Sequence, residues 1–82
     1  MQYQIEFKPR ALKDLKAVDN PEARRIVEKI TLMREDLGGD VKRLTNFTPE
    51  YRLRVGNYRV LFELEGDKVV IYRVRHRRDA YS

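Results

Sequence analysis

The sequence predicts an α+β fold in which two helices pack against one face of a small antiparallel sheet. Three features point to it: polar and apolar residues alternate near the start, apolar residues recur at helical spacing between residues 9 and 37, and alternation with period two begins at Tyr51. Helices on one side of such a sheet cover its apolar face. A chain of 82 residues forms a single domain, 1–82, too small for a deep enclosed cavity.

The first half of the chain predicts one strand and two helices. Residues 2–7 alternate as a half-buried strand does, and Pro9 suits the first turn of a helix. The apolar positions of that helix are Ala11, Leu12, Leu15 and Val18. Asn20, followed by proline, predicts the N-cap of a second helix that extends to about Leu37, where Gly38-Gly39 is a stop signal. Its apolar stripe is Ala23, Ile26, Val27, Ile30, Met33 and Leu37.

The second half predicts strands. A short extended piece at 41–44 precedes three strands at 51–55, 58–65 and 68–75. Gly56-Asn57 is a two-residue hairpin signal, which places Val55 opposite Tyr58 and Arg54 opposite Arg59. In the middle strand the expected core residues are Tyr58, Val60, Phe62 and Leu64, and the residues expected on the other face are Arg59, Leu61 and Glu63.

Composition excludes several kinds of site. The chain has no cysteine and one histidine, so it offers no disulfide, thiolate metal site or multi-histidine site. No glycine pattern of a nucleotide-binding loop is present. We therefore expect neither a metal nor a small-molecule cofactor. No apolar run approaches the length of a membrane span and no export signal is visible, so we expect a cytoplasmic protein without a membrane partner.

The positive charge is confined to the second half. The formal net charge is +5, and residues 42–82, with ten basic and five acidic side chains, carry all of it. Arg52, Arg54 and Arg59 are expected on one sheet face, where like charges directly opposite cost up to about 1 kcal/mol per pair. Arginine grips phosphate with a planar fork, so the cluster indicates a phosphate-binding face. The alternative is an ordinary solvated basic surface.

The end of the chain adds a second set of candidates. Residues 73–81 contain four arginines together with the single histidine, an aspartate and a tyrosine. They leave the last strand next to Arg59, so we expect their side chains, His76 included, to reach the same face, although residues 69–74 are apolar on both faces until Arg73 and leave the register of that strand open. His76 can move a proton near neutral pH, and Tyr81 can stack on a base or contact a phosphate. The alternatives are a solvated basic end, a structural histidine and a packing tyrosine. The chemistry left open is metal-free cleavage of RNA by its own 2′-OH, for which arginines stabilise the charge on the phosphorus centre.

The chain resembles the RelE/ParE superfamily of type II toxin–antitoxin toxins over essentially its whole length. Three stretches carry the resemblance: the strand and helix at 3–15, the segment 51–63 with its Arg-Leu-Arg and Gly-Asn-Tyr-Arg runs, and the ending His-Arg-Arg-Asp-Ala-Tyr at 76–81. The resemblance implies a RelE-like, microbial-RNase-type fold. In the RelE branch it implies a ribosome-dependent mRNA interferase that cuts mRNA in the A site, inhibits translation, and leaves a 2′,3′-cyclic phosphate and a 5′-OH.

The resemblance also implies roles for particular residues. Arg59 and Arg77 match basic residues that grip the scissile phosphate, and Tyr81, with His76 as its deputy, matches the group that stacks on the base or moves a proton. The residues expected to bind RNA or phosphate around them are Arg52, Arg54, Arg75 and Arg78. Family members often have lysine where this chain has Arg52 and Arg54; a guanidinium stays protonated, which shifts proton transfer to Tyr81 or His76.

Partners and alternatives follow from the same resemblance. It implies a RelB-like antitoxin in a hetero-oligomer, with the ribosome and mRNA as targets. The ParE branch inhibits DNA gyrase without nuclease activity, so a gyrase inhibitor is the alternative function. A third possibility is a catalytically weakened toxin that mainly binds its antitoxin. We expect the RNase branch, because the sheet arginines occur together with a terminal tyrosine.

Overall fold

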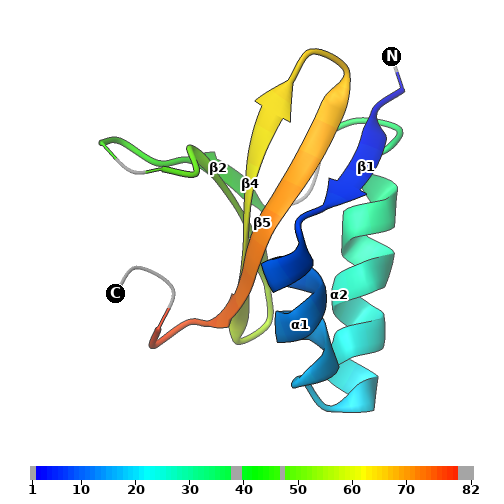
Figure 1. The fold of residues 1–82 in the computed structure, drawn as a ribbon, viewed down its shortest axis with the longest axis vertical. Helices are drawn as coiled ribbons and strands as arrows, with labels where there is room; N and C mark the ends of the chain where they lie inside the picture. Colours follow the sequence, from blue (N-terminus) through cyan, green and yellow to red (C-terminus); the bar gives the residue numbers. More distant parts are fainter. Residues whose placement is uncertain (1, 38–39, 47, 80–82) are drawn as a thin grey trace.

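The computed structural model describes residues 2–37, 40–46 and 48–79. The elements follow one another as the strand β1 (Gln4–Phe7), the helices α1 (Pro9–Lys16) and α2 (Asn20–Leu32), and the strands β2 (Val41–Arg43), β3 (Tyr51–Val55), β4 (Tyr58–Glu65) and β5 (Lys68–His76) (Figure 1). This is the predicted order of elements. No helix in these ranges is long and apolar enough to cross a membrane.

The five strands form one mixed sheet in the order β1-β5-β4-β3-β2. The pairs from β2 through β5 are antiparallel, as predicted, but β1 pairs with β5 in parallel, with Gln4 opposite Lys68 and Phe7 opposite Ile71. The prediction of a wholly antiparallel sheet is wrong for this edge. Local alternation could not reveal it, because the two strands are about sixty positions apart in the sequence and their relative direction depends on the whole path between them.

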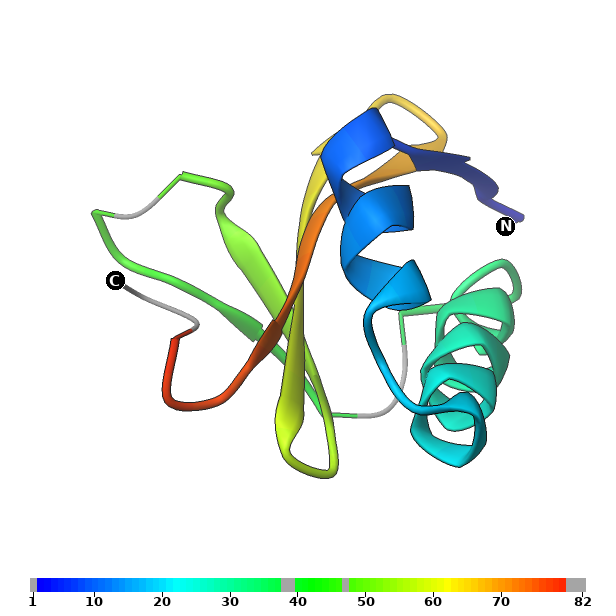
Figure 2. The ribbon, with the colours of Figure 1, turned by 60° about the horizontal axis from the view of Figure 1, so that its bottom comes forward.

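Both helices lie on one side of the sheet, and the segment between β2 and β3 and the end of β5 lie toward the other side (Figure 2). The core fills the space between the helices and the sheet. Its buried members are Ala11, Ile26, Ile30, Met33, Leu53, Val55, Val60, Phe62, Val69, Ile71 and Val74. The predicted α+β class, with two helices covering one sheet face, is therefore confirmed.

Helix α2 ends earlier than the predicted limit. Its last residue is Leu32 rather than Leu37, and the chain continues in tight turns in which Arg34 N–H donates to Thr31 C=O and Glu35 N–H to Leu32 C=O. Met33 and Leu37 still contact the core from these turns, so the apolar stripe did not mark the end of the helix. The expected stop at Gly38-Gly39 lies outside the described residues. The N-cap is Asp19, one position before the predicted Asn20.

The predicted β3–β4 hairpin is confirmed in its register. Val55 pairs with Tyr58 and Arg54 with Arg59, and Gly56 has the positive φ, 57°, that the tight turn needs. One irregularity was not predicted: Leu61 pairs with Arg73 and Phe62 with Ile71, so the residue between the two β5 partners forms a bulge. The bulge shifts the alternation of β5 by one residue, so that Val69 and Ile71 before it and Val74 after it all face the core.

Candidate phosphate-binding face

Four arginines share the sheet face that points away from the helices. Arg54, Arg59 and Arg75 are consecutive partners across β3, β4 and β5, and Arg52 lies two residues before Arg54 on the same face. They alternate with the buried core residues Leu53, Val55, Val60 and Val74. We call Arg52, Arg54, Arg59 and Arg75 the arginine face. The predicted opposition of Arg54 and Arg59 is confirmed, and Arg75 extends it into a row of three.

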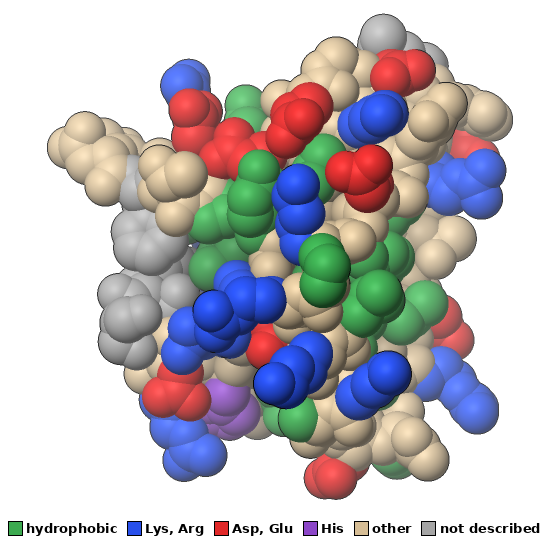
Figure 3. Space-filling view, in the orientation of Figure 1, with side chains coloured by type: hydrophobic (Ala, Val, Ile, Leu, Met, Phe, Trp, Pro, Cys, Tyr) green, Lys and Arg blue, Asp and Glu red, His purple; other side chains and the backbone are tan. Residues whose placement is uncertain are grey.

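Charge is separated along the sheet. In Figure 3, lysine and arginine side chains gather over the lower half of the view, where β5 ends, and most acidic side chains lie in the upper half. Along the β4–β5 ladder, Glu63 and Glu65 pair with Val70 and Lys68, at the opposite end from the pair Arg59–Arg75. An anion that approaches this surface is therefore drawn toward the end that carries the arginine row.

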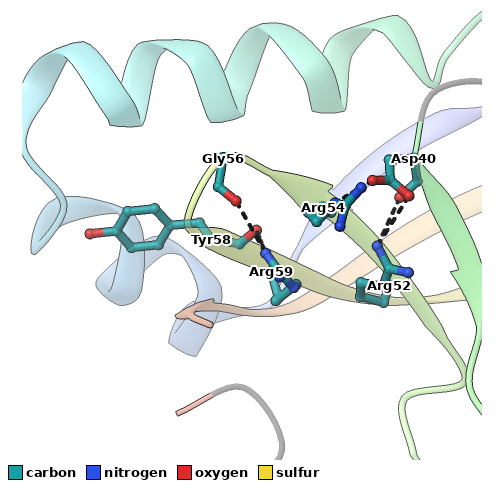
Figure 4. Close-up of polar contacts among 6 residues, drawn as sticks. All are labelled: Asp40, Arg52, Arg54, Gly56, Tyr58 and Arg59. Atoms are coloured by element: carbon teal, nitrogen blue, oxygen red, sulfur yellow. Dashed lines mark hydrogen bonds and ion pairs between the residues drawn. The ribbon is translucent and has the colours of Figure 1, made fainter. Parts of the chain in front are cut away.

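Asp40 binds two members of the arginine face. Its carboxylate forms an ion pair with Arg54 Nε, and its Oδ1 lies 3.3 Å from Arg52 Nη1 (Figure 4). Desolvation raises the pKa of Asp40, but the hydrogen bonds and charges of Arg54 and then Arg52 outweigh it and hold that pKa below its usual 3.8. The residue is ionised at neutral pH and offsets the repulsion between the two arginines. Sequence reasoning missed it, because nothing near position 40 marks a partner twelve residues away.

Arg59 is held by the backbone of the hairpin. Its Nη1 donates to the carbonyl oxygens of Gly56, at 3.2 Å, and Tyr58, at 3.1 Å (Figure 4). A guanidinium carries five N–H donors on three nitrogens, so Nε and Nη2 remain to grip an anion bidentately. The backbone contacts fix the position of the group without neutralising its positive charge.

His76 lies on the opposite face from the arginines. It pairs with Tyr58 across β4 and β5, and the two rings meet edge to face with 5.4 Å between centroids. Tyr58 packs against the core, so alternation along the strands puts both rings on the helix side. The expectation that His76 reaches the same face as Arg59 is wrong, because β5 continues in register through residue 76. Burial, followed by the charges of Glu22 and Asp19, raises the pKa of Tyr58.

The remaining predicted residues follow the end of β5. Arg77 and Arg78 are exposed, and a hydrogen bond of 2.7 Å from Arg77 N–H to Asn57 C=O ties the turn they form to the hairpin loop. Arg78 N–H lies 3.4 Å from His76 Nδ1. Tyr81 lies outside the described residues. Within the described ranges, no group of three or more acidic or histidine side chains is close enough to hold a metal ion.

A set of hydrogen bonds between α1 and β5, which we call the Asp14 clamp, fixes the strand that carries Arg75. Asp14 of α1 accepts hydrogen bonds from Arg73 Nε at 2.8 Å, Arg73 Nη2 at 3.2 Å and Val74 N–H at 3.0 Å. Burial raises the pKa of Asp14, but these bonds and the charges of Arg73 and Arg75 bring it below 3.8. The sequence signal was an arginine inside an otherwise apolar strand. Its partner on α1 could not be identified from spacing.

This clamp leads to a prediction about stability and pH. Replacing Asp14 by asparagine should lower the free energy of unfolding at pH 7 by about 1–3 kcal/mol, because charge-assisted hydrogen bonds to half-buried groups are lost. Since the folded pKa is depressed, the clamp stabilises the protein above the unfolded pKa and is lost as the pH falls through the folded value. Urea denaturation gives the free energy of unfolding of D14N and of wild type, both at pH 7 and at a pH below 3.8, where the Asp14 carboxylate becomes protonated.

The two proteins should therefore differ at pH 7 and converge in acid. The matched control is Glu28→Gln, which removes one negative charge from an exposed position on α2 and should leave the free energy of unfolding within about 0.5 kcal/mol of wild type. A difference between D14N and wild type that persists undiminished in acid would contradict the assignment.

Fold and site together define a class of protein: a small α+β domain with an open cationic sheet face. The sequence model of the family described as the ParE toxin of the type II toxin–antitoxin system, parDE, matches residues 5–81. The chain belongs to this family of toxins, within the RelE/ParE superfamily. The resemblance inferred from the three sequence stretches is thereby confirmed.

Individual relatives point to the RelE side of the superfamily. Toxin RelE3 of Methanocaldococcus jannaschii is 43% identical over 47 residues, which cover 57% of this chain and 53% of that protein. The chain thus matches about half the length of this curated relative. The toxin in the crystal structure of the RelB-RelE antitoxin–toxin complex from Methanococcus jannaschii superposes with a TM-score of 0.78 at 34% identity, covering 93% of this chain and 94% of that one.

A second solved structure has a closely similar fold. The toxin–antitoxin complex RelBE2 from Mycobacterium tuberculosis contains a chain that matches with a TM-score of 0.81 at 26% identity, and the match covers 94% of this chain and 100% of that one. Both solved neighbours are complexes of a toxin with its antitoxin. The helix-on-sheet architecture is therefore the architecture of RelE-type toxins.

Proposed function

We propose that this toxin is a ribosome-dependent endoribonuclease that cleaves mRNA in the A site and so inhibits translation. The observation that carries the proposal is the row of Arg54, Arg59 and Arg75 across three strands of an exposed sheet face. Arg59 and Arg75 of this row are placed to contact neighbouring phosphates, and the charge of the row suits the extra negative charge of a pentacoordinate phosphorus centre. The names of the relatives, Toxin RelE3 and RelB-RelE, favour the same branch.

In the proposed reaction the 2′-oxygen of one nucleotide attacks the adjacent phosphorus while the bond from phosphorus to the 5′-oxygen breaks. A base takes the proton of the 2′-OH and an acid protonates the leaving 5′-oxygen, so a 2′,3′-cyclic phosphate and a 5′-OH result. The proposed reaction, as written, uses no metal ion. Arg59 and Arg77 would grip the reacting phosphate, and Arg75 and Arg78 would bind its neighbours. Arginine stays protonated, so another group must move the protons.

Tyr81 is the proposed proton-transfer or base-stacking group, with His76 as the second candidate. The contact between His76 and Tyr58 on the helix side favours Tyr81. We expect wild type to cut translated mRNA, Tyr81→Phe to lose most of this activity, and His76→Gln to retain it. Primer extension on mRNA in a translation extract locates the cuts and compares the three proteins. If Tyr81→Phe cuts like wild type while His76→Gln does not, the two roles are exchanged.

A gyrase inhibitor is the second candidate, because the family model that matches the chain is named for ParE. A supercoiling assay with purified protein separates the two functions: inhibition of gyrase at a stoichiometric dose, with mRNA left intact, supports this candidate and refutes the nuclease. A weakened toxin would neither cut mRNA nor inhibit gyrase, and its induction would not arrest growth.

An antitoxin partner is proposed under either function, because both solved neighbours named above are toxin–antitoxin complexes. Complementary charge on a RelB-like antitoxin would speed its association with the arginine face. A shallow apolar groove between α1 and α2, lined by Leu15, Ala23 and Val27 among others, is a candidate site for one of its segments. Co-expression with the product of an adjacent small acidic gene, followed by co-purification, tests the pairing.

A further inference from the structure

The four members of the arginine face are not equivalent. Arg52 and Arg54 both contact the carboxylate of Asp40, and the side chain of Arg52 is only 12% exposed. Arg59 donates to carbonyl oxygens, which do not neutralise its charge, and Arg75 lies beside it in the cross-strand row, where its charge acts on Asp14 of α1. Asp40 therefore binds one pair of the four arginines, Arg52 and Arg54, whereas Arg59 and Arg75 have different surroundings.

Backbone hydrogen bonds hold Asp40 in place. Its carbonyl oxygen accepts the N–H of Arg54 at 3.0 Å and Arg52 Nη1 at 3.3 Å. The next residue, Val41, begins β2 and pairs with Leu53. The backbone of Asp40 is thus attached to the β2–β3 ladder, which keeps its carboxylate within reach of the two arginines. An arriving phosphate meets a site that is already occupied by an anion of the protein itself.

We propose that Asp40 is a built-in competitor for phosphate, which withholds Arg52 and Arg54 from RNA and leaves the contacts to Arg59 and Arg75. The inference rests on the proposed function insofar as RNA is the ligand of this face. Asp40 acts through the arginines and is a positioning residue, not a catalytic one. Its effect is to limit sequence-independent affinity for polyanions, so that binding depends on the few contacts at the hairpin end of the row.

The test is binding of a single-stranded oligonucleotide by Asp40→Asn. Asparagine keeps the shape and an acceptor oxygen but removes the charge, which frees Arg54 to contact a phosphate. One added contact to a single strand steepens the salt dependence of log K by about 0.7 and raises affinity about fivefold at 0.1 M salt. The probe is a 12-nucleotide 2′-O-methyl RNA, which lacks the attacking hydroxyl, and fluorescence anisotropy at several salt concentrations gives both quantities.

Two variants serve as controls. Asp67→Asn adds the same charge at the exposed β4–β5 turn and should change neither the slope nor the affinity by as much as twofold. Asp40→Glu keeps the charge and should behave like wild type. If D40N binds no better than D67N, or if neither D40N nor wild type binds, the inference is overturned. A purely structural role for Asp40 would weaken binding, which also overturns it.

Arg54→Gln and Arg59→Gln provide an independent route if D40N does not fold. Arg54→Gln should leave the salt slope unchanged, and Arg59→Gln should lower it by about 0.7, since of these two arginines only Arg59 is proposed to contact phosphate. If both variants lowered the salt dependence of binding by the same amount, the inference would be overturned. Because the oligonucleotide cannot be cut, the binding experiment does not depend on nuclease activity. If the oligonucleotide binds as expected but mRNA stays intact in the translation extract, the proposed nuclease function is refuted and the role of Asp40 is not.

Discussion

Replacing Arg59 by alanine should reduce cleavage of ribosome-bound mRNA by about 10²–10³-fold, the loss expected when one preorganised donor to a transition-state oxyanion is removed. Arg59 is the central member of the cross-strand row, and its Nη1 is fixed by two backbone carbonyls. The guanidinium therefore reaches the phosphate without a further cost in ordering. Single-turnover cleavage, followed by primer extension with purified ribosomes, measures the effect.

The matched control is Arg10→Ala, which removes an exposed positive charge from α1, on the other side of the sheet. It should leave the rate within about twofold of wild type, since exposed charges more than a Debye length apart are largely screened. Arg59→Lys should recover only part of the activity, because an ammonium group cannot grip a phosphate bidentately. Equal rates for R59A and R10A would show that Arg59 does not contact the reacting phosphate.

Replacing Phe62 by alanine should lower the free energy of unfolding by about 3–5 kcal/mol, the usual cost of deleting a buried aromatic ring. Phe62 is fully buried in the middle of β4 and stacks on Tyr51 of β3, with 5.5 Å between ring centroids. A domain of this size has a total stability of about 4–12 kcal/mol, so the loss brings the protein close to unfolding. Urea denaturation followed by circular dichroism measures the change.

Leu32→Ala is the control for that experiment. Leu32 ends α2 and is 61% exposed, so its truncation should cost less than about 1 kcal/mol. Phe62→Leu should fall between the two, because leucine refills part of the cavity. If F62A were no less stable than L32A, the packing of β4 between the helices and the rest of the sheet would have to be different.

Local sequence signals predicted much of this fold. Gly56-Asn57 determined the hairpin register, and strand alternation then placed Arg54 opposite Arg59 on the face away from the helices. Proline at position 9 and the apolar spacing that follows it located α1. These predictions were correct because each depends on a turn or a periodicity within a few residues, where neighbouring residues decide the backbone conformation.

Contacts between distant segments could not be predicted in the same way. Asp40 contacts Arg52 and Arg54, and Asp14 contacts Arg73, but no periodicity links an acidic residue to its partner across the fold. The bulge in β5 and the parallel pairing of β1 likewise depend on the complete path of the chain. The position of His76 was wrong because the register of β5, apolar on both faces, was uncertain from the sequence.

The parallel pairing of β1 with β5 also bears on when the sheet and its arginine face can form during synthesis of the chain. Strand β5 contributes Arg75 to the arginine face and fills the sheet position between β1 and β4. Until residue 76 has been made and released, β1 has no neighbour in the sheet and Arg59 has no partner on its β5 side. The nascent chain therefore carries an incomplete cationic face until β5 has been made and has paired with β4.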